Sequence, residues 1–370
     1  MMNEHLNHTV VLIPSLEPDD KLVPYLKELL HEGFRVLVVD DGSSEKYQPI
    51  FSEAESLEGC WVTHHEVNKG KGEALKTGYR YIKEAEAFKD CTQVVTADAD
   101  GQHILPDVIN VAKAACEKPQ SLVLGSRDFS LPQVPPKSRF GNRTTSFVFW
   151  LLYSRWLPDT QTGLRGFGRQ LLDFMIDVEG SRFEYEMNVL IACSRANVPM
   201  DVVTIETVYH NENTGTHFHP IRDSIKIYKV ILKNFFKFMS SSFIATAIDL
   251  CLCFILFDVL RNAGLEPESL RITTATVIAR LVSASINFTL NKNFVFKLKK
   301  HGSRALIRYI ILCVCIAVLS SAGVTAFHAG LGLSDKIAKV ICDTLLFFLS
   351  YRAQRGWVFD DKDTEKEAQA

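Results

Sequence analysis

The sequence has little net charge. Its 41 lysine and arginine residues nearly balance 43 aspartate and glutamate residues, which leaves a formal charge of -2 over 370 residues. A chain of this length can form two domains. The balance of charge names no partner by itself, and we expect no nucleic acid among the partners.

Paired cysteine spacings and a leader segment are also absent. The nine cysteines are scattered, without the spacing of a zinc site or of a secreted disulfide framework. Cys251, Cys253, Cys313 and Cys315 stand in very apolar stretches, where cysteine usually serves as a small hydrophobic side chain. The first residues lack a basic segment followed by a long apolar run, so we expect no cleaved signal peptide. These features favour a reducing, cytosolic setting for the first domain.

Near residue 235 the sequence changes from alternating strand and helix patterns to long apolar stretches. Before that point, short runs such as "TVVLIP", "FRVLVVDD", "TQVVTAD" and "SLVLGSR" alternate with helical patterns, for example over residues 22–32 and 72–88. Strands separated by helices predict an α/β fold with a mainly parallel, Rossmann-like sheet, here over residues 1–217. The ligands of such sheets lie outside the carboxyl ends of the strands.

The rest of the chain predicts an all-α transmembrane domain over residues 239–360. Four apolar stretches lie at about 239–260, 272–290, 306–328 and 337–351. A helical span needs roughly 17 to 25 residues, so the last stretch is short, and polar residues interrupt the second. Four spans are expected, and a buried helical core is the alternative.

Basic residues predict the orientation of this domain. The loop between the second and third stretches carries Lys292, Lys297, Lys299, Lys300 and Arg304. Such loops face the cytoplasm. We therefore expect a multi-pass protein of the cell (inner) membrane, with the first domain and the charged tail, residues 361–370, on the cytoplasmic side.

Two further segments suit the surface of a membrane. In residues 218–238, apolar side chains recur at helical spacing and four lysines fall on another face. This pattern is typical of a helix among lipid headgroups, and an amphipathic helix packed on the first domain is the alternative. Residues 135–159 place three basic side chains before an aromatic apolar run that is too short to span.

The motif "VVTADADGQH" carries the clearest chemistry. Asp98 and Asp100 follow a predicted strand, and in an extended chain both side chains project to the same side. Two carboxylates suit Mg²⁺ or Mn²⁺, which binds one or two such groups together with substrate phosphates. Acids in a loop are more often solvated, so the assignment depends on other motifs. These are "LIPSLEP", "VVDDGSS" with Asp40 and Asp41, and the glycine-rich turn "NKGKGEALKTG", whose N–H groups can approach a phosphate.

Over about residues 8–220 the chain resembles the family-2 glycosyltransferases of GT-A fold, and among them the dolichol-phosphate-mannose synthase-like enzymes. The matching segments, in the family's order, are "IPSLEP", "VVDDGSS", "NKGKGEAL", "TADADGQH", "GSRDF" and "DTQTGLRGF". The resemblance implies a nucleotide-sugar site composed of Pro14, Leu16, Glu17, Val38, Asp40, Asn68, Lys71, Asp98, Ala99, Asp100, Gln102 and Arg127. Lys69 and Lys71 both qualify as the basic residue of the glycine-rich turn.

The same resemblance implies roles in metal binding and transfer. A Mg²⁺ or Mn²⁺ ion is expected on Asp98, Asp100 and Gln102. The implied catalytic residues are Asp100, Arg127, Asp159, Gln161 and Arg165, with Thr162, Glu184 and Glu186 near the reacting centre. The acceptor phosphate is assigned to Arg143, Arg165 and His217. His217, in "NTGTHFHP", stands where these enzymes often carry a constant positive charge, and a histidine is charged only conditionally near neutral pH.

The second half resembles the GtrA-like four-span membrane proteins, through "SFIATAIDLCLCFIL", "ASINFTLNKNFVF" and "LSYRAQRGWVF". The repeated endings suggest two similar hairpins. In that family such domains accompany cell-surface polysaccharide synthesis and are proposed to move polyprenyl-linked sugars or to anchor a transferase. Side chains that are costly in lipid should face an interior: Asp249, Arg280, Asn287, Lys339 and Asp343. A structural pair of Asp249 with Arg280 and a role in substrate passage both stay open.

Together these features predict transfer of a hexose from a UDP- or GDP-sugar to polyprenyl phosphate, which supplies lipid-linked sugar for cell-surface glycans. A lipid phosphate is already anionic near neutral pH, so it needs no strong general base, and direct attack predicts inversion. The expected partners are the nucleotide sugar, the lipid and the membrane, and a homo-oligomer stays open. One alternative is a lipid-linked sugar translocase whose first domain only binds nucleotide. The other is a processive polysaccharide synthase, whose Q-x-x-R-W motif has only "AQRGW" as a counterpart here.

Overall fold

The computed structural model of the protein describes residues 6–132, 134, 136–206, 220–296, 298 and 302–359. The chain divides into two compact units, residues 1–230 and 231–370. The first unit contains a seven-stranded sheet and the second is helical.

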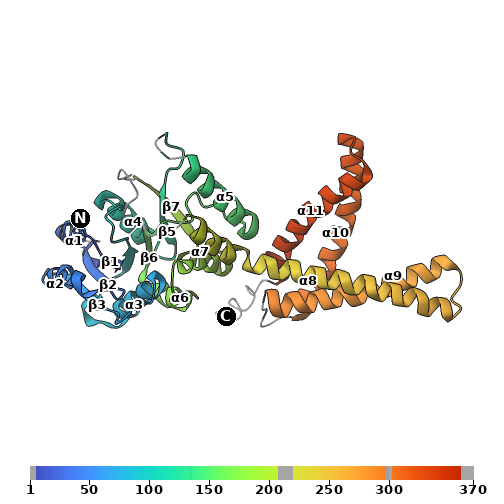
Figure 1. Cartoon of the computed structure of the whole chain (residues 1–370), viewed down its shortest axis with the longest axis horizontal. Coiled ribbons are helices and arrows are strands. Elements are labelled where there is room, and N and C mark those ends of the chain that lie inside the picture. Colours follow the sequence, from blue (N-terminus) through green and yellow to red (C-terminus); the bar gives the residue numbers. More distant parts are fainter. Residues whose placement is uncertain are drawn as a thin grey trace. The chain divides into compact units, whose positions relative to one another are not determined.

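The sheet of the first unit is mainly parallel, as the alternation of strands and helices predicts (Figure 1). Its order is β3-β2-β1-β4-β6-β5-β7, and β6 alone among these strands runs antiparallel to both of its neighbours. The strands are β1 (Thr9–Ser15), β2 (Arg35–Asp40), β3 (Cys60–His64), β4 (Gln93–Thr96), β5 (Leu122–Arg127), β6 (Arg165–Gly168) and β7 (Met200–Ile205).

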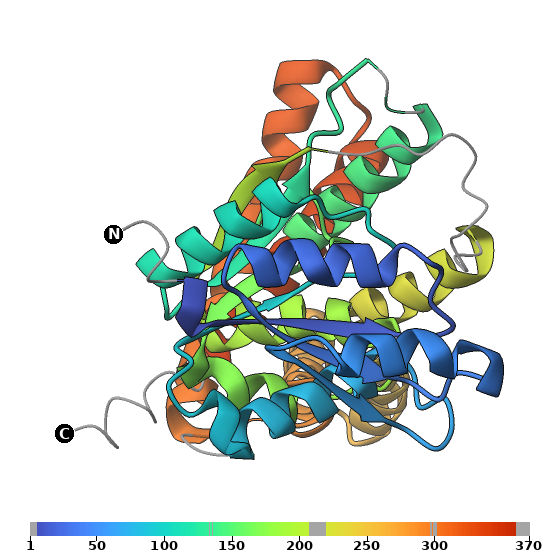
Figure 2. The ribbon, with the colours of Figure 1, turned by 90° about the vertical axis from the view of Figure 1, so that its left-hand side faces the viewer.

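Helices cover both faces of this sheet because alternate strand residues point to opposite sides. Val11 and Ile13 of β1 join a buried core with α1 (Leu22–His31), α2 (Gln48–Glu55) and α4 (Leu105–Glu117). Leu12, between them, faces α3 (Lys71–Glu84), where a Cβ on Gly78 would lie 2.3 Å from the leucine Cδ1. Figure 2 shows α1 and α3 on opposite sides of the strands. The remaining helices are α5 (Pro136–Tyr153), α6 (Leu172–Asp177) and α7 (Glu184–Ala196).

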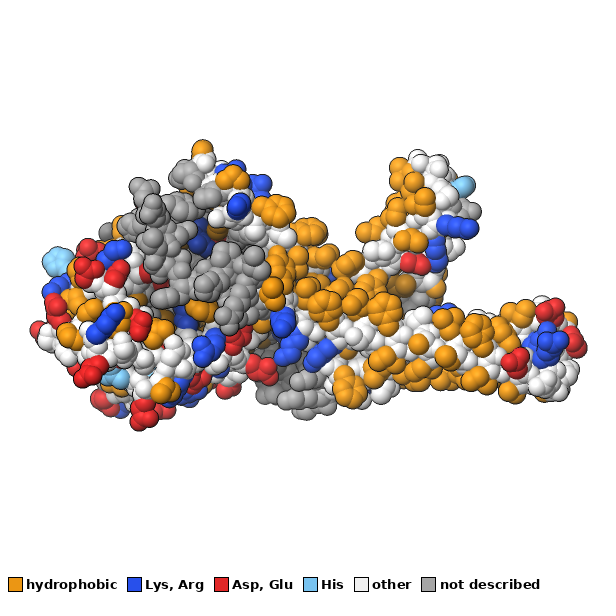
Figure 3. Space-filling model, in the orientation of Figure 1, with side chains coloured by type: hydrophobic (Ala, Val, Ile, Leu, Met, Phe, Trp, Pro, Cys, Tyr) orange, Lys and Arg blue, Asp and Glu red, His pale blue; other side chains and the backbone are white. Residues whose placement is uncertain are grey.

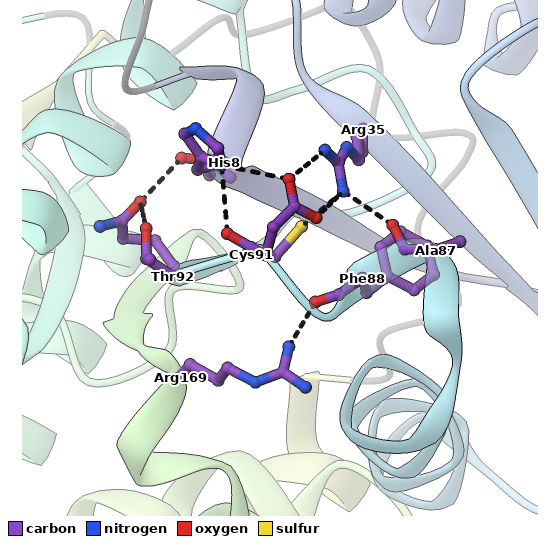
Figure 4. A network of polar contacts seen from close by, with 10 residues as sticks. His8, Arg35, Ala87, Phe88, Cys91, Thr92 and Arg169 are labelled. Atoms are coloured by element: carbon purple, nitrogen blue, oxygen red, sulfur yellow. Dashed lines mark hydrogen bonds and ion pairs between the residues drawn. The ribbon is translucent and has the colours of Figure 1, made fainter.

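A polar network connects the amino ends of the parallel strands (Figure 4). Arg35, at the start of β2, donates to both oxygens of Asp90 at 2.5 and 2.6 Å and to the Ala87 carbonyl at 2.7 Å. The Nδ1 atom of His8, just before β1, lies 3.1 Å from the Asp90 carbonyl. The hydrogen bond from Arg35 is the main cause that lowers the pKa of Asp90 to about 2. This network joins β1, β2 and β4 and leaves their carboxyl ends for a ligand.

Four helices make up most of the second unit: α8 (Pro220–Asn262), α9 (Glu268–Leu290), α10 (Gly302–Leu331) and α11 (Asp335–Ala353). Helix α8 begins in the last residues of the first unit. Each predicted span lies within one of them. Among the described residues, however, two stretches are long and apolar enough to cross a membrane, residues 227–262 and 302–331. Arg271 and Arg280 interrupt the apolar sequence of the continuous helix α9. Helix α11 is short and carries Lys339 and Asp343. Four spans are therefore not confirmed.

The predicted interfacial helix, residues 218–238, is not separate from the first predicted span. Its described residues, 220–238, and the first predicted span form the single helix α8. Within the first unit, the Tyr228 hydroxyl of α8 lies 3.3 Å from Thr145 Oγ1 of α5. Lysines are good helix formers, so the change from an amphipathic to an apolar pattern does not end the helix.

The two hairpins of the second unit end alike, as the repeated sequence endings suggest. Both α9 and α11 pass into a π-helical turn, Asn291–Val295 and Gln354–Val358. The fully buried Asn291 donates to Gln354 Oε1 at 2.9 Å and to Asn287 Oδ1 at 3.0 Å. This polar contact links the two endings.

Large hydrophobic side chains cover the outside of these helices (Figure 3). Charged side chains stand among them in pairs. Arg280 lies 3.1 Å from Asp249, which also accepts from Ser283 at 2.8 Å. Lys339 lies 3.1 Å from Asp343. One of the two open alternatives, the pair of Asp249 with Arg280, is thus present. Of the side chains expected to face an interior, Asp249 is largely buried, but Arg280, Lys339 and Asp343 are exposed within the described residues.

Candidate active site

Asp98 and Asp100 follow β4 at the carboxyl end of the sheet, as predicted. The backbone of Gly163 lies directly against Asp98, since a Cβ on this glycine would lie 2.4 Å from Asp98 Oδ2. Thr96 Oγ1 donates to the Gly163 carbonyl at 2.8 Å. The "DTQTGLRGF" segment therefore reaches the acidic motif, and it does so because residue 163 has no side chain.

Lys71 provides the cation next to these acids. Its Nζ lies 2.6 Å from Asp98 Oδ1 and 3.1 Å from Glu186 Oε1 of α7. The neighbouring Lys69 is exposed. Of the two lysines left open by the sequence, Lys71 is the one that contacts the acids.

Asp41 holds the glycine-rich turn in place. Its carboxylate accepts the N–H groups of Lys69 at 2.9 Å and Gly70 at 2.8 Å, and lies 2.7 Å from His65 Nδ1. Gly70 has a φ of +99°, which disfavours any other residue. Two N–H groups expected to approach a phosphate are thus bound to Asp41. The turn instead positions Lys71 at the start of α3.

The surroundings shift the pKa values of Asp98 and Asp100 in opposite directions. Burial alone raises the pKa of Asp98, but the ammonium of Lys71 and the nearby imidazole of His103 hold it well below its usual range. For Asp100, burial and then the negative charge of Asp98 raise the pKa. Asp100 thus lacks a positive partner as close as the one Asp98 has.

These residues fit a divalent cation of the Mg²⁺ or Mn²⁺ type. Asp98 and Asp100 offer carboxylate oxygens, and the backbone N–H of Gln102 donates to Asp100 Oδ1 at 3.0 Å, which places Gln102 beside them. The raised pKa of Asp100 marks a carboxylate that a cation would stabilise. No group of three or more His, Cys, Asp or Glu ligands occurs in the described part of the chain. Water or substrate phosphate would supply the remaining ligands, as Mg²⁺ sites commonly require.

The predicted nucleotide residues lie around the ends of β1 and β2. Asp40 pairs in register with Ser15, next to Pro14. Leu16 is 39% exposed, and Glu17, with a φ of +50°, accepts a hydrogen bond from Ser44 at 3.3 Å. Asn68 and Ala99 lie in the loops after β3 and β4. Val38 differs from the rest, because it is fully buried in the core below this edge.

Asp40 is extensively hydrogen-bonded within the protein. It accepts from the Ser43 N–H at 2.8 Å and from Gln48 at 3.3 Å, and lies 2.9 Å from His64 Nδ1. Burial raises the pKa of Asp40, but these hydrogen bonds outweigh burial and lower it. For His64, burial lowers the pKa, but the hydrogen bonds to Asp40 and Glu55 outweigh burial and raise it.

The side chains of Arg127 and Asp159 form a two-point contact. Arg127 Nε donates to Asp159 Oδ2 at 2.7 Å and a terminal nitrogen donates to Oδ1 at 3.2 Å. Asp159 is fully buried and also accepts the Gln161 N–H at 3.0 Å. The structure thus brings together three predicted catalytic residues.

A pocket of about 220 Å³ lies beside this contact, between the loop after β5, helix α5 and strand β7. Arg127 and Arg143 both line it, together with Asn142, Ser146 and Trp156. The buried atoms Asn142 Oδ1 and Ser146 Oγ have no hydrogen-bond partner among the described residues. Arg143 and the Ser146 hydroxyl can both donate to an anionic ligand in this pocket, whereas Arg127 is paired with Asp159, Asp128 adds a negative charge and Asn142 Oδ1 can only accept.

The other predicted acceptor residues lie elsewhere. Arg165 is buried in β6, where it donates to the carbonyls of Thr162 at 3.0 Å and Glu186 at 2.9 Å. It does not line the pocket of Arg143. Its contacts join the "DTQTGLRGF" loop to α7 beneath the acids. His217 lies outside the described residues.

Sequence reasoning assigned no role to His103, Asn142 or Ser146. The buried Nε2 of His103 lies 3.4 Å from Asp98 Oδ2 and has no hydrogen bond within the described parts of the chain. Its place next to Gln102 was the available signal. Asn142 and Ser146 are spaced to share one helix face, a pattern that also fits simple packing against the sheet.

Comparison with known proteins accounts for both parts of the chain. The model of glycosyl transferase family 2 matches residues 10–175, and the model of the GtrA/DPMS transmembrane domain matches residues 237–359. An uncharacterized protein from Methanocaldococcus jannaschii is 31% identical over 231 residues, which cover 61% of this chain and 92% of the relative.

Two further proteins are similar to the first part. The UDP-N-acetylglucosamine–dolichyl-phosphate N-acetylglucosaminyltransferase of Methanococcus voltae is 27% identical over 217 residues, 54% of this chain and 85% of the relative. The glucosyl-3-phosphoglycerate synthase of Mycobacterium tuberculosis, solved with Mn²⁺, UDP and glucosyl-3-phosphoglycerate, aligns with a TM-score of 0.46 at 15% identity, over 63% of this chain and 83% of that one. From the two family matches and the relative at 31% identity, the chain belongs to glycosyl transferase family 2, carries a GtrA/DPMS transmembrane domain, and is a glycosyltransferase.

Proposed function

We propose that this glycosyltransferase moves a hexose from a UDP- or GDP-sugar to polyprenyl phosphate at the cytoplasmic face of a membrane. The transmembrane domain and the dolichyl-phosphate transferase among the relatives support a lipid acceptor. The observation that carries the proposal is the pocket with Arg127 and Arg143, because it shares helix α5 with an exposed aromatic surface.

That surface suits a lipid boundary. Phe140 is 75% exposed and Phe147 50%, while Trp150 and Trp156 are also exposed. Aromatic side chains with neighbouring basic residues, here Lys137, favour the interface between headgroups and acyl chains. An acceptor phosphate held at Arg143 would therefore lie close to the lipid headgroups.

The donor site is assigned to the edge formed by Asp40, Lys71, Asp98, Asp100 and Gln102. A divalent ion at Asp98, Asp100 and Gln102 would neutralise charge that develops on the departing nucleoside diphosphate. Lys71 adds a fixed positive charge at the same place. Asp40 and Glu17 would orient the base and ribose.

The chain's own residues can then position the acceptor. A phosphate monoester is mostly dianionic near neutral pH and attacks without a general base, so Arg127 and Arg143 have to hold and orient it. Asp159 orients Arg127 through the two-point contact. Ser146 can donate a further hydrogen bond from within the pocket. Direct displacement of the diphosphate inverts the anomeric carbon.

We further propose that α9 and α11 also cross the membrane, which gives four spans. Polar pairs between neighbouring helices, such as Asp249 with Arg280, lower the cost of charge in such helices. Basic residues after α9, including Lys292, then place that loop, residues 1–217 and the tail in the cytoplasm. Residues 220–238 would continue the first span on the cytoplasmic side, because α8 has no break between the two segments.

The processive alternative gains no support from its motif. Gln354 of "AQRGW" is buried, accepts from Asn291 and donates to Ser350 at 3.1 Å. These contacts bind it into the ending of the hairpin. A translocase without transferase chemistry would leave the match of residues 10–175 to glycosyl transferase family 2 unexplained.

A transfer assay tests the proposal. Full-length protein in lipid nanodiscs is given polyprenyl phosphate, Mg²⁺ or Mn²⁺ and a labelled sugar on UDP or GDP. We expect labelled, organic-extractable lipid with one donor, and a higher acceptor KM in Arg143→Ala. Arg195→Ala, an exposed arginine of α7 outside the pocket, is the matched control. Equal acceptor KM values in the wild type and Arg143→Ala would reject the assignment of the acceptor site.

A further inference from the structure

Lys71 occupies the position of a bound cation among the acids of the candidate donor site. Its ammonium lies 2.6 Å from Asp98 Oδ1 and 3.1 Å from Glu186 Oε1, and its side chain is 19% exposed. The two carboxylates come from the end of β4 and the start of α7, so one ammonium bridges two elements of the fold. Asp98 is also among the residues that fit a divalent ion.

The backbone that carries Lys71 is held rigidly. Asp41 binds the N–H groups of the two preceding residues, Lys69 and Gly70. On the other side, a Cβ on Gly72 would lie 2.5 Å from Tyr185 Cβ, so α3 lies tight against α7. The lysine stem, in contrast, has four rotatable carbons and can swing its ammonium between partners.

The balance of charge gives the ammonium a reason to move. Asp98, Asp100 and Glu186 contribute three negative charges when ionised, and Lys71 compensates one of them. A nucleoside diphosphate brings further negative charge to the same edge, and its oxygens are strong acceptors for an ammonium. Its divalent ion then competes with Lys71 for Asp98, since like charges that share one carboxylate repel.

We propose that Lys71 is a movable counter-cation that occupies Asp98 until the donor arrives and then transfers to the donor diphosphate. The empty site consequently holds a divalent ion weakly, and nucleotide and metal bind together. This inference deepens the proposed donor site and depends on it. A lysine that merely braced α3 against α7 would stay on Asp98 and Glu186 in both states.

Metal binding without catalysis tests the inference. Mn²⁺ is titrated into full-length protein in nanodiscs, with and without UDP, and free Mn²⁺ is followed by electron paramagnetic resonance. In Lys71→Met we expect Mn²⁺ to bind on the order of tenfold more tightly without UDP, because a competing charge is gone. The increase in Mn²⁺ affinity caused by UDP should shrink, and by linkage so should the increase in UDP affinity caused by Mn²⁺.

Three variants and a stability measurement serve as controls. Lys71→Arg keeps the charge and should resemble the wild type. Lys69→Met removes the adjacent exposed lysine, which does not contact the acids, and should also leave Mn²⁺ affinity unchanged. Lys71→Gln keeps a polar side chain for Asp98, so it should fold even where methionine does not, and it should show the same rise in affinity. Thermal unfolding shows which variants are folded.

Unchanged or weaker Mn²⁺ binding without UDP, in a folded Lys71→Met or Lys71→Gln protein, would overturn the inference. This result is separate from failure of the proposed function. Transfer to polyprenyl phosphate could be absent while the coupling of Mn²⁺ and UDP depends on Lys71. Transfer could also occur while the coupling is independent of Lys71.

Discussion

Asp159 holds the guanidinium of Arg127 through two hydrogen bonds, at 2.7 and 3.2 Å, from a position with no solvent exposure. The two residues lie 32 positions apart, at the end of β5 and just before β6. This contact holds the Arg127 side chain at the wall of the pocket, which Arg143 also lines. In the proposed reaction, Asp159 would act on the acceptor through Arg127.

Asp159→Asn should reduce kcat/KM for transfer on the order of a hundredfold, because a small misplacement of a positioning group has an effect of that size. The amide keeps the shape of the side chain but lacks the charge that orients Arg127. Steady-state kinetics with varied acceptor measures the effect. Undiminished transfer in this variant would show that the contact is not used.

Gly163→Ala should weaken Mn²⁺ binding about tenfold or more, a loss typical of changes to residues that orient metal ligands. The new methyl group would meet Asp98 Oδ2 at 2.4 Å and displace the carboxylate or the loop. Gly141→Ala is the matched control, because nothing lies within 4 Å of a Cβ there. Equal Mn²⁺ affinity in both variants would contradict the close approach of Gly163 to Asp98.

The contact of His64 with Asp40 should make thermal stability depend on pH. The folded state raises the pKa of His64, so its contribution is complete below the unfolded value of about 6.5 and is lost as pH rises through the higher folded value. The lowered pKa of Asp40 acts oppositely, because its contribution is lost only when pH falls far into the acid range. The difference in Tm between wild type and His64→Gln should be larger near about pH 5.5 than near about pH 8.5.

That measurement has a direct control. Ser52→Ala changes an exposed residue of α2 that carries no titratable group, so its difference in Tm should not vary with pH. A difference in Tm for His64→Gln that grows with pH would contradict the sign derived for His64.

Asp100→Ala should abolish metal-dependent transfer. Asp100 has no cation as close as Lys71 is to Asp98, and burial with the charge of Asp98 raises its pKa. In the proposed site, a divalent ion would provide the cationic partner of this carboxylate. Initial rates over a series of Mg²⁺ and Mn²⁺ concentrations check the prediction, and full activity at any metal concentration would remove Asp100 from the metal site.

The sequence predicts the parts of the fold and site that follow from local patterns. Alternating strands and helices predicted the parallel sheet, and strand ends predicted where Asp40, Asp98 and Asp100 lie. Contacts between distant segments could not be predicted in this way. Lys71 meets Glu186 because α3 packs on α7 through glycines, and these long-range contacts leave no periodic signal in the sequence.

The predicted sites of Arg165 and Val38 illustrate the same limit. A family motif identifies both residues, but the register of the sheet decides their surroundings. Arg165 pairs with Thr96 inside the sheet and donates to two carbonyls, while Val38 is part of the core. The number of spans stays a prediction for a related reason, because the polar residues of α9 and the short length of α11 leave two helices that hydropathy alone identifies as spans.

The most direct test of the account is the chemical identity of the product. Full-length protein in nanodiscs, with polyprenyl phosphate and labelled nucleotide sugars, should form a single labelled lipid in which one sugar is bound to the phosphate with inverted anomeric configuration. Mass spectrometry and NMR of the extracted lipid establish both properties. A labelled polymer, or nucleotide-sugar binding with no labelled lipid for any UDP- or GDP-sugar, would contradict the account.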